Sequence, residues 1–295
     1  MTISLRFLRR LKKLREFFSL LVRNRMGLVG LAIIIFFLTL ALFAPFLRTV
    51  NPTKVGTSEN ILLPPSSQFW LGTDDLAKDV WSQIVYGSRI SLTVGFLAAI
   101  ITVFTGSLIG LIAGFYGGKI GEVLMRIVDF FMMLPMLPLM IVLAAVLGPN
   151  IWNIIFVISI VSWPTTARVI RSQVLSLKER TFIEAARCIG ASDSLLMFGE
   201  ILPNVVPIMF AESVLMVTEA IYAEAVLSFL GLGDPMNISW GMMLHFAFES
   251  GTMGKAFWWV LPPIACIVIL IIGFTFLGTA ITDVLEPGYK EAHGF

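Results

Sequence analysis

The sequence predicts an all-α integral membrane protein with six transmembrane helices. Of its 295 residues, 57% are hydrophobic and only 14% are charged, whereas soluble domains use about 45–50% apolar residues. The apolar residues gather into segments long enough to cross a hydrocarbon layer, which takes about 20 helical residues. Basic residues lie mostly between these segments on one side of the predicted membrane. These observations exclude a soluble globular fold.

The chain begins with a basic segment. Residues 1–26 hold eight Lys or Arg, and their Leu and Phe residues recur three or four positions apart, which predicts an amphipathic helix on the cytoplasmic membrane surface. The apolar segment 27–47 is the first predicted transmembrane helix. A secretory signal peptide is the alternative, but this segment is long enough to span and lacks a small-x-small cleavage site.

Residues 48–90 are predicted to form an extracytoplasmic loop, followed by a core transmembrane domain, residues 91–281, and a cytoplasmic tail, residues 282–295. Five apolar segments of the core are predicted to span the membrane, namely 91–115, 124–147, 151–170, 205–230 and 257–281. With an inside amino terminus, the inside segments hold sixteen Lys or Arg and the outside segments hold five. The positive-inside rule therefore places both termini in the cytoplasm.

A polar segment from Thr181 to Asn204 separates the fourth and fifth predicted spans, on the cytoplasmic side. Its pattern predicts two short helices around one hinge. The first ends near Gly190, a residue type that tolerates left-handed backbone. Ser192 or Asp193 caps the second, whose carboxyl end meets Pro203. An ordinary helical hairpin between two spans would look the same.

No enzyme or metal signature stands out. HExxH and GxSxG are absent, and the two histidines, His245 and His293, are too few and too far apart for a metal site. The two cysteines, Cys188 and Cys266, lie in no disulfide or metal-ligand spacing. We therefore expect no catalytic residues and no bound metal or cofactor in this chain.

A phosphate-binding loop is also absent. Gly254-Lys255 resembles the end of such a loop, but Glu249 and Ala256 occupy the positions of its opening Gly and its Ser or Thr. Any ATP-driven work must therefore use the energy of another protein.

One enzyme class shares a short pattern with the chain. Gly231-Leu232-Gly233-Asp234 matches the GxGD pattern of intramembrane aspartyl proteases, and Asp129 could supply the second carboxylate. However, Asp234 falls at the outer end of span five, Asp129 is not preceded by Tyr, and no Pro-Ala-Leu triplet occurs. A four-residue match is weak, and a true dyad would require both Asp129→Asn and Asp234→Asn to abolish activity.

The polar segment carries the first family resemblance. Glu184-Ala185-Ala186, Gly190 after three further residues, and Leu202-Pro203 resemble the EAA loop of ABC-importer permeases. The coupling loop of that family would correspond to residues 172–204 here. One position departs from the pattern, because Glu200 occupies a slot that usually holds an apolar residue.

Other motifs resemble the dipeptide/oligopeptide/nickel branch of these permeases, in particular its C-type subunit. They are the segments 71–80, 86–91, 227–233 and 239–241, which read LGTDDLAKDV, YGSRIS, LSFLGLG and SWG. Ala77-Lys78 departs from the usual Gly-Arg, and Thr279-Ala280 stands where Asp-Gly is typical. The resemblance covers about residues 20–287.

The resemblance implies a type I ABC-importer permease fold in a prokaryotic cell membrane. It implies these partners: a homologous second permease subunit, two cytoplasmic ATPase subunits that hold ATP and magnesium, and an extracytoplasmic solute-binding protein. Lipid surrounds the complex, and nucleic acid has no role. Di- or oligopeptides are the expected substrate; nickel chelates, glutathione and oligosaccharides are alternatives. The residues implied in ATPase coupling are Glu184, Ala185, Ala186, Gly190, Leu202 and Pro203.

Acidic residues inside the predicted spans are candidates for the translocation pathway. Glu212 and Glu219 are seven residues apart and therefore share one helical face, whereas Glu224 lies about 140 degrees around the helix from Glu219. Asp129 lies near the inner end of span three. Asp129 and Glu224 could instead brace helices. A secondary transporter that uses Glu212 and Glu219 as a proton relay is an alternative from another class, and the EAA loop argues against it.

The outer loop is the expected contact surface for the solute-binding protein. Its acidic residues Asp74, Asp75 and Asp79 are the candidates for this contact, although the segment from Leu71 to Arg89 could also act as a plug or gate.

Overall fold

The computed structural model describes residues 24–48, 50–52 and 54–285. Most of the predicted surface helix at residues 1–26, and residues 286–295 of the tail, lie outside this part of the chain. The described elements are, in order, α2 (Arg25–Leu42), α3 (Ala44–Leu47), η1 (Ser58–Asn60), α4 (Val80–Tyr116), α5 (Gly118–Met133), α6 (Met136–Leu147), α7 (Ile151–Lys178), α8 (Thr181–Cys188), η2 (Leu195–Ile201), α9 (Leu202–Phe229), α10 (Trp240–Glu249) and α11 (Phe257–Leu285).

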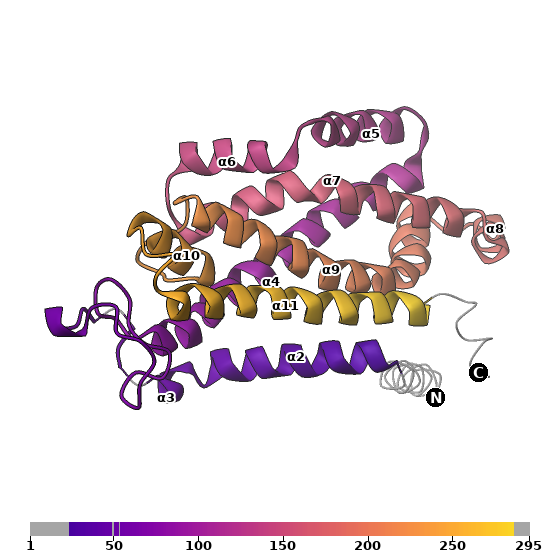
Figure 1. Ribbon diagram of the computed structural model, residues 1–295. Helices are drawn as coiled ribbons and strands as arrows, with labels where there is room; N and C mark the ends of the chain where they lie inside the picture. The colour runs from indigo at the N-terminus through magenta and orange to yellow at the C-terminus, as the bar shows by residue number, and fades with distance from the viewer. Residues whose placement is uncertain (1–23, 49, 53, 286–295) are drawn as a thin grey trace.

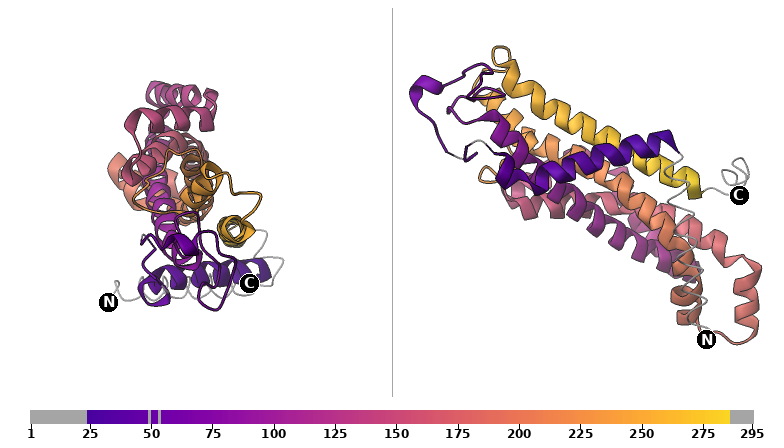
Figure 2. Two further views of the ribbon diagram at one scale, coloured as in Figure 1. Left: turned by 60° about the vertical axis from the view of Figure 1, so that its left-hand side comes forward. Right: turned by 90° about the horizontal axis from the view of Figure 1, so that it is seen from below.

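The long helices α2, α4, α7, α9 and α11 form one elongated bundle in which α4 crosses its neighbours obliquely, as Figures 1 and 2 show. The loop between α3 and α4 lies at one end of this bundle, and α8 projects from the other end (Figure 1). Five helical segments are long and apolar enough to cross a membrane, and a bent pair, α5 and α6, makes a sixth if it is counted as one span. The all-α membrane architecture is therefore confirmed.

The third predicted span is not one continuous helix. Helix α5 ends at Met133, and α6 begins at Met136 at an angle of 87°. Leu134, between them, is extended, with φ −79° and ψ 134°, because a residue that precedes proline is disfavoured in helical conformation. Pro135 therefore divides the predicted span 124–147 into two helices.

Part of the predicted extracytoplasmic loop 48–90 is helical. Helix α4 begins at Val80, so the last part of the predicted loop 48–90 belongs to a helix of 37 residues. Asp79 caps this helix, since its Oδ2 accepts the backbone N–H of Ser82 at 3.0 Å. At the other end of the bundle, α7 continues to Lys178, beyond the predicted end at residue 170.

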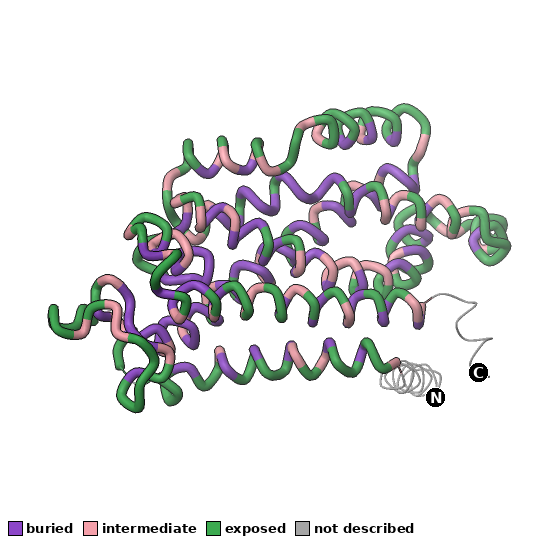
Figure 3. Tube along the Cα trace, viewed as in Figure 1, coloured by how far each residue is buried: buried purple, intermediate pink, exposed green. Residues whose placement is uncertain are grey.

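Helices α4 and α7 pack closely where α4 carries glycines, which have no side chain. A Cβ on Gly110 would lie 2.5 Å from the carbonyl oxygen of Ala167, and a Cβ on Gly106 would lie 2.7 Å from that of Trp163. Small residues allow such approach, which helices in a bilayer need because lipid gives little hydrophobic driving force for their association. Figure 3 shows buried residues along α4 and α7, whereas α5, α6 and α8 carry many exposed ones.

Candidate functional site

Helix α8 presents an exposed surface at the end of the bundle. Only Ile183 of this helix is buried, at 1% exposure, and it packs in a cluster with residues of α4, α7 and η2. Glu184 and Ala185 are exposed and Ala186 is half-buried. Ile189, just past the helix, is 87% exposed. One buried apolar side chain thus anchors the helix, and most of its other residues are exposed.

Gly190 forms the predicted hinge after α8. Its φ is +87°, and the N–H of Ala191 donates to the carbonyl of Ala186 at 3.1 Å, which closes the helix end. A Cβ at this glycine would meet nothing within 4 Å. Glycine is therefore favoured here by its backbone conformation, and close approach within this chain is not the reason. Ser192 caps the next helix weakly, with its Oγ 3.4 Å from the N–H of Leu195.

The second predicted helix does not end at Pro203. The π-helical segment η2 runs directly into α9, and Pro203 lies in the first turn of α9, where its missing N–H is tolerated. A π-helix holds more residues per turn than an α-helix. Glu200 is consequently exposed, and the neighbouring Ile201 is fully buried. This shift explains how a glutamate is accepted in a slot that is usually apolar.

Glu224 is buried where three elements meet. The carboxylate of this α9 residue is 2% exposed and accepts the hydroxyl of Ser228 at 2.7 Å and that of Ser91 on α4 at 3.2 Å. Ser239, the residue that caps α10, is a third hydroxyl partner. Such a placement favours a bracing role over contact with a passing substrate.

Trp240 fixes the start of α10 at the same junction. Its side chain is fully buried, its Nε1–H donates to the carbonyl of Ile84 at 3.0 Å, and its ring packs edge-on against Phe37. A Cβ on Gly87 would lie 2.9 Å from the Trp240 ring, and one on Gly241 would lie 2.8 Å from a carbonyl of α9. The motifs YGSRIS, LSFLGLG and SWG are far apart in sequence, and they therefore pack against one another in the fold.

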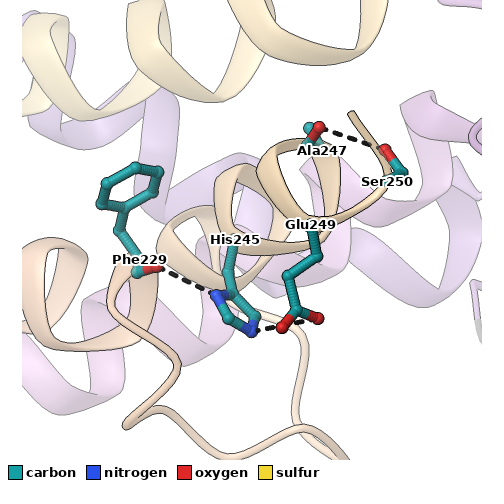
Figure 4. Close-up of polar contacts among 5 residues, drawn as sticks. All are labelled: Phe229, His245, Ala247, Glu249 and Ser250. Carbon is teal, nitrogen blue, oxygen red and sulfur yellow. Dashed lines mark hydrogen bonds and ion pairs between the residues drawn. The ribbon is translucent and has the colours of Figure 1, made fainter. Parts of the chain in front are cut away.

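His245 connects α10 to the end of α9, as Figure 4 shows. Its Nδ1 lies 3.0 Å from the carbonyl oxygen of Phe229, and its Nε2 lies 3.5 Å from the carboxylate of Glu249. Gly231 makes room for the ring, since a Cβ there would lie 2.8 Å from it. Among the described residues no cluster of His, Cys, Asp or Glu could hold a metal ion.

Two of the three loop aspartates point inward. Asp74 is 3% exposed, and its Oδ1 accepts the N–H groups of Leu76 and Lys78 at 2.9 and 2.7 Å, while its Oδ2 accepts Gln83 Nε2 at 2.7 Å. Asp79 is 2% exposed and caps α4. Their carboxylates shape the loop and are not available for direct contact with another protein. Asp75 alone of the three is partly exposed.

The folded loop that holds Asp74 should become less stable as pH rises. Burial raises the pKa of Asp74 above its ordinary 3.8, against the opposing hydrogen bonds from Lys78 and Gln83. Because the folded pKa is raised, the contribution of the protonated form is complete below pH 3.8 and is lost as pH rises through the folded pKa. We expect the melting temperature of the wild type, relative to that of Asp74→Asn, to fall between pH 4 and pH 7 in thermal unfolding of the detergent-solubilised protein. A difference that stays constant with pH would contradict this assignment.

Ala77 occupies a left-handed backbone position, which favours glycine. Its φ is +56°, which costs a residue with a Cβ about 1 kcal/mol. Ala77→Gly should therefore raise the melting temperature by about 2 °C in the same assay. The same change at Ala113, inside α4, should lower it because glycine destabilises a helix. Equal shifts of the melting temperature at the two positions would contradict the assignment of backbone strain to Ala77.

The intramembrane acids differ in their surroundings. Asp129 on α5 forms an ion pair with Arg168 on α7, with 2.6 Å between Oδ1 and Nη2. Glu212 is half-buried and Glu219 is exposed on α9. Arg168 was not among the candidate residues, although its place within an apolar span was a signal for it.

Comparison with known proteins identifies the family. Residues 106–291 match the family described as binding-protein-dependent transport system inner membrane component. The chain belongs to this family of permeases. Residues 6–65 also match the N-terminal transmembrane domain of oligopeptide transport permease C. This permease is therefore a multi-pass inner-membrane transport component with no catalytic role of its own.

Three relatives are similar over most of the permease. The dipeptide permease protein DppC of Alkalihalophilus pseudofirmus is 39% identical, covering 94% of this chain and 90% of the relative. The oligopeptide permease protein OppC of Bacillus subtilis is 36% identical over 91% and 87% of the two chains. The di/tripeptide permease protein DppC of Pseudomonas aeruginosa is 34% identical over 95% and 93%.

A solved structure shares the fold of the permease. A chain of the MetNI methionine ABC transporter, in an inward-facing conformation, superposes with a TM-score of 0.55 at 19% identity, covering 69% of this chain and 97% of the other. The predicted permease fold is therefore confirmed.

Proposed function

We propose that this permease is one half of the membrane pore of an ATP-driven importer of di- or oligopeptides. The names of its relatives support this substrate class, because those relatives are transporters of dipeptides, tripeptides or oligopeptides. A homologous permease supplies the other half, two cytoplasmic ATPase subunits hold ATP and magnesium, and a solute-binding protein delivers the peptide outside. Nickel chelates, glutathione and oligosaccharides are the substrates to be excluded.

The observation that carries the proposal is the exposed α8 at one end of the bundle. Helix α8 projects beyond the long helices (Figure 1). It carries Glu184, Ala185 and Ala186 and is followed by the exposed Ile189 and Gly190. An apolar surface rimmed by polar residues suits a protein partner. In this proposal the ATPases bind it on the cytoplasmic side, with both termini of the permease on the same side, as the distribution of Lys and Arg favours.

A movement of α8 can reach the pore along the continuous chain, through η2 and α9. Leu202 and Pro203 lie at the start of α9, directly after η2, so a push on α8 and η2 tilts the helix that carries Glu212 and Glu219. Those two carboxylates face the passage in this proposal and attract the ammonium group of a peptide.

Replacement of Glu212 and Glu219 by Gln should reduce the rate of peptide uptake about tenfold, the ratio that 1.4 kcal/mol represents, without loss of assembly with the other subunits. Uptake kinetics in proteoliposomes measure the expected fall in rate. Co-purification of the subunits is the control for assembly. Unchanged kinetics would remove both residues from the passage.

The decisive experiment purifies the permease with its native partners and identifies, by mass spectrometry, what the co-purified binding protein holds. Uptake of that compound by proteoliposomes should require ATP on the cytoplasmic side of the complex and the binding protein on the opposite side of the membrane. A binding protein loaded with a nickel chelate or a sugar would reject peptides as the substrate, and uptake driven by a proton gradient without ATPases would reject the importer.

A further inference from the structure

Two exposed arginines lie beside one tyrosine where α3 meets α4. Arg48 caps the carboxyl end of α3, and Arg89 lies on α4. Their guanidinium carbons lie 5.9 and 6.0 Å from the centre of the Tyr86 ring, which is the separation of a cation–π contact. Trp81 joins the two helices here, since its Nε1–H donates to the carbonyl of Leu47 at 2.9 Å. The two positive charges are therefore held at most about 12 Å apart, because each is close to the same ring.

Neither arginine has an anionic partner in the part of the chain that the structure describes. No ion pair between the described residues includes Arg48 or Arg89. Two like charges this close repel each other, and the half-buried ring between them carries no charge that could offset the repulsion. An anion that contacted both guanidinium groups would remove this repulsion.

Both arginines mark the same boundary of the membrane. Arg48 is the first charged residue after the uncharged segment 26–47, and Arg89 is the last one before the uncharged segment 90–116. Helix α2 has 18 residues and is therefore about 27 Å long, close to a hydrocarbon layer of about 30 Å. Its far end meets α3 at the end of the bundle opposite α8 (Figure 1). The guanidinium groups thus lie at the level of the lipid headgroups.

Exposed apolar side chains continue from the arginines. Phe43 and Phe46, shortly before Arg48, are 48% and 84% exposed. On α4, residues that share the face of Arg89 at helical spacing continue toward the middle of the span, and they are exposed or half-buried: Thr93, Leu97, Ile100 and Phe104. A ligand with an anionic group and long apolar chains would contact both parts of this surface.

We propose that Arg48 and Arg89 bind the phosphate of an anionic phospholipid, whose acyl chains lie along the exposed face of α4. The planar guanidinium groups donate to the phosphate oxygens, for which their fork is well shaped. Basic pockets between membrane helices are suited to such headgroups. A free inorganic anion would contact only the arginines and leave the apolar surface uncovered. The site is separate from the proposed function, since it involves neither the transported substrate nor ATP.

The test titrates the purified full-length permease in detergent with phosphatidylglycerol and measures the dissociation constant by native mass spectrometry. Arg48→Gln combined with Arg89→Gln should weaken binding at least about tenfold, because both charge-assisted contacts are lost. Arg25→Gln combined with Arg187→Gln removes two exposed arginines at the other end of the bundle and should change the constant less than about twofold. Equal constants for the wild type and the first pair, or equal losses in both pairs, would overturn the site.

A conservative pair separates loss of charge from damage to the fold. Arg48→Lys combined with Arg89→Lys keeps both positive charges and should bind phosphatidylglycerol within about threefold of the wild type. Without added lipid, the Gln pair and the Lys pair should melt at the wild-type temperature. A Lys pair that binds as weakly as the Gln pair would overturn the proposal that positive charge at this place holds a phosphate.

Three further comparisons test the kind of anion. Phosphatidylcholine, which has no net charge, should bind at least about tenfold more weakly than phosphatidylglycerol, and equal binding would overturn the preference for an anionic lipid. Millimolar inorganic phosphate should leave the lipid bound, and displacement would identify a free-anion site instead. A Gln pair that binds phosphatidylglycerol normally but no longer binds the solute-binding protein would assign the arginines to an acidic protein surface and reject the lipid site.

Discussion

Gly190→Asp should leave the permease folded in the membrane and reduce ATP-driven uptake at least about tenfold, the ratio for 1.4 kcal/mol. Asp is one of the residues that tolerate the left-handed region, so the φ of +87° at this position can be kept. The added side chain meets nothing within 4 Å in this chain, so folding should tolerate it. It would, however, place an unpaired carboxylate on the surface that we propose for ATPase docking, where burial of the charge is costly.

Two control variants isolate the cause. Gly190→Asn has nearly the same shape without the charge and should retain much more uptake. Gly251→Asp tests the other end of the bundle, because Gly251 also has a positive φ, of +68°, and open space around it, just after α10. This second variant should transport normally. ATPase co-purification and uptake at wild-type levels in Gly190→Asp would show that α8 is not the coupling surface.

Glu224→Ala should lower the free energy of unfolding by about 3 kcal/mol, through the cavity it leaves and the hydroxyl partners it deprives of an acceptor. The carboxylate accepts from Ser91 and Ser228, on two different helices, and is almost fully buried. Glu224→Gln keeps the size and one acceptor oxygen and should cost about 1 kcal/mol. Thermal unfolding in detergent, followed by tryptophan fluorescence, measures both.

Glu219→Ala is the matched control for the Glu224 variants, since Glu219 lies on the same helix and is exposed. Its stability should stay within about 0.5 kcal/mol of the wild type. If the two alanine variants lose equal stability, the buried hydrogen bonds around Glu224 do not brace α4, α9 and α10.

Local sequence was enough where one residue type determines the backbone. Gly190 marked the end of α8 because few other residues adopt its φ. The span-length apolar segments marked the long helices, since backbone polar groups in lipid must be satisfied within each helix. The break at Leu134 and Pro135 was readable in principle, because proline restricts the residue before it, but the uniformly apolar composition around it concealed the bend.

Contacts between distant segments could not be predicted in the same way. Glu200 is accepted because η2 places Ile201 against the core instead, and this depends on how η2 packs beneath α4 and α7. Asp74 and Asp79 resembled a contact surface in the sequence, yet the loop folds their carboxylates inward onto backbone N–H groups. A charged residue type specifies what a side chain can bind, and the tertiary structure decides which partner is within reach.

By itself the sequence determined that this chain spans the membrane several times, that its Gly254-Lys255 segment lacks the phosphate-binding loop pattern, and that the segment around Gly190 ends one helix and begins another. These properties follow from composition, charge placement and local backbone preference. Only the tertiary structure decided that three separate motifs join around Glu224 and Trp240, and that Asp129 meets Arg168 beside an open cavity. The reason is that hydrogen bonds and ion pairs act over a few ångströms, and only folding brings residues so far apart in the chain within that distance.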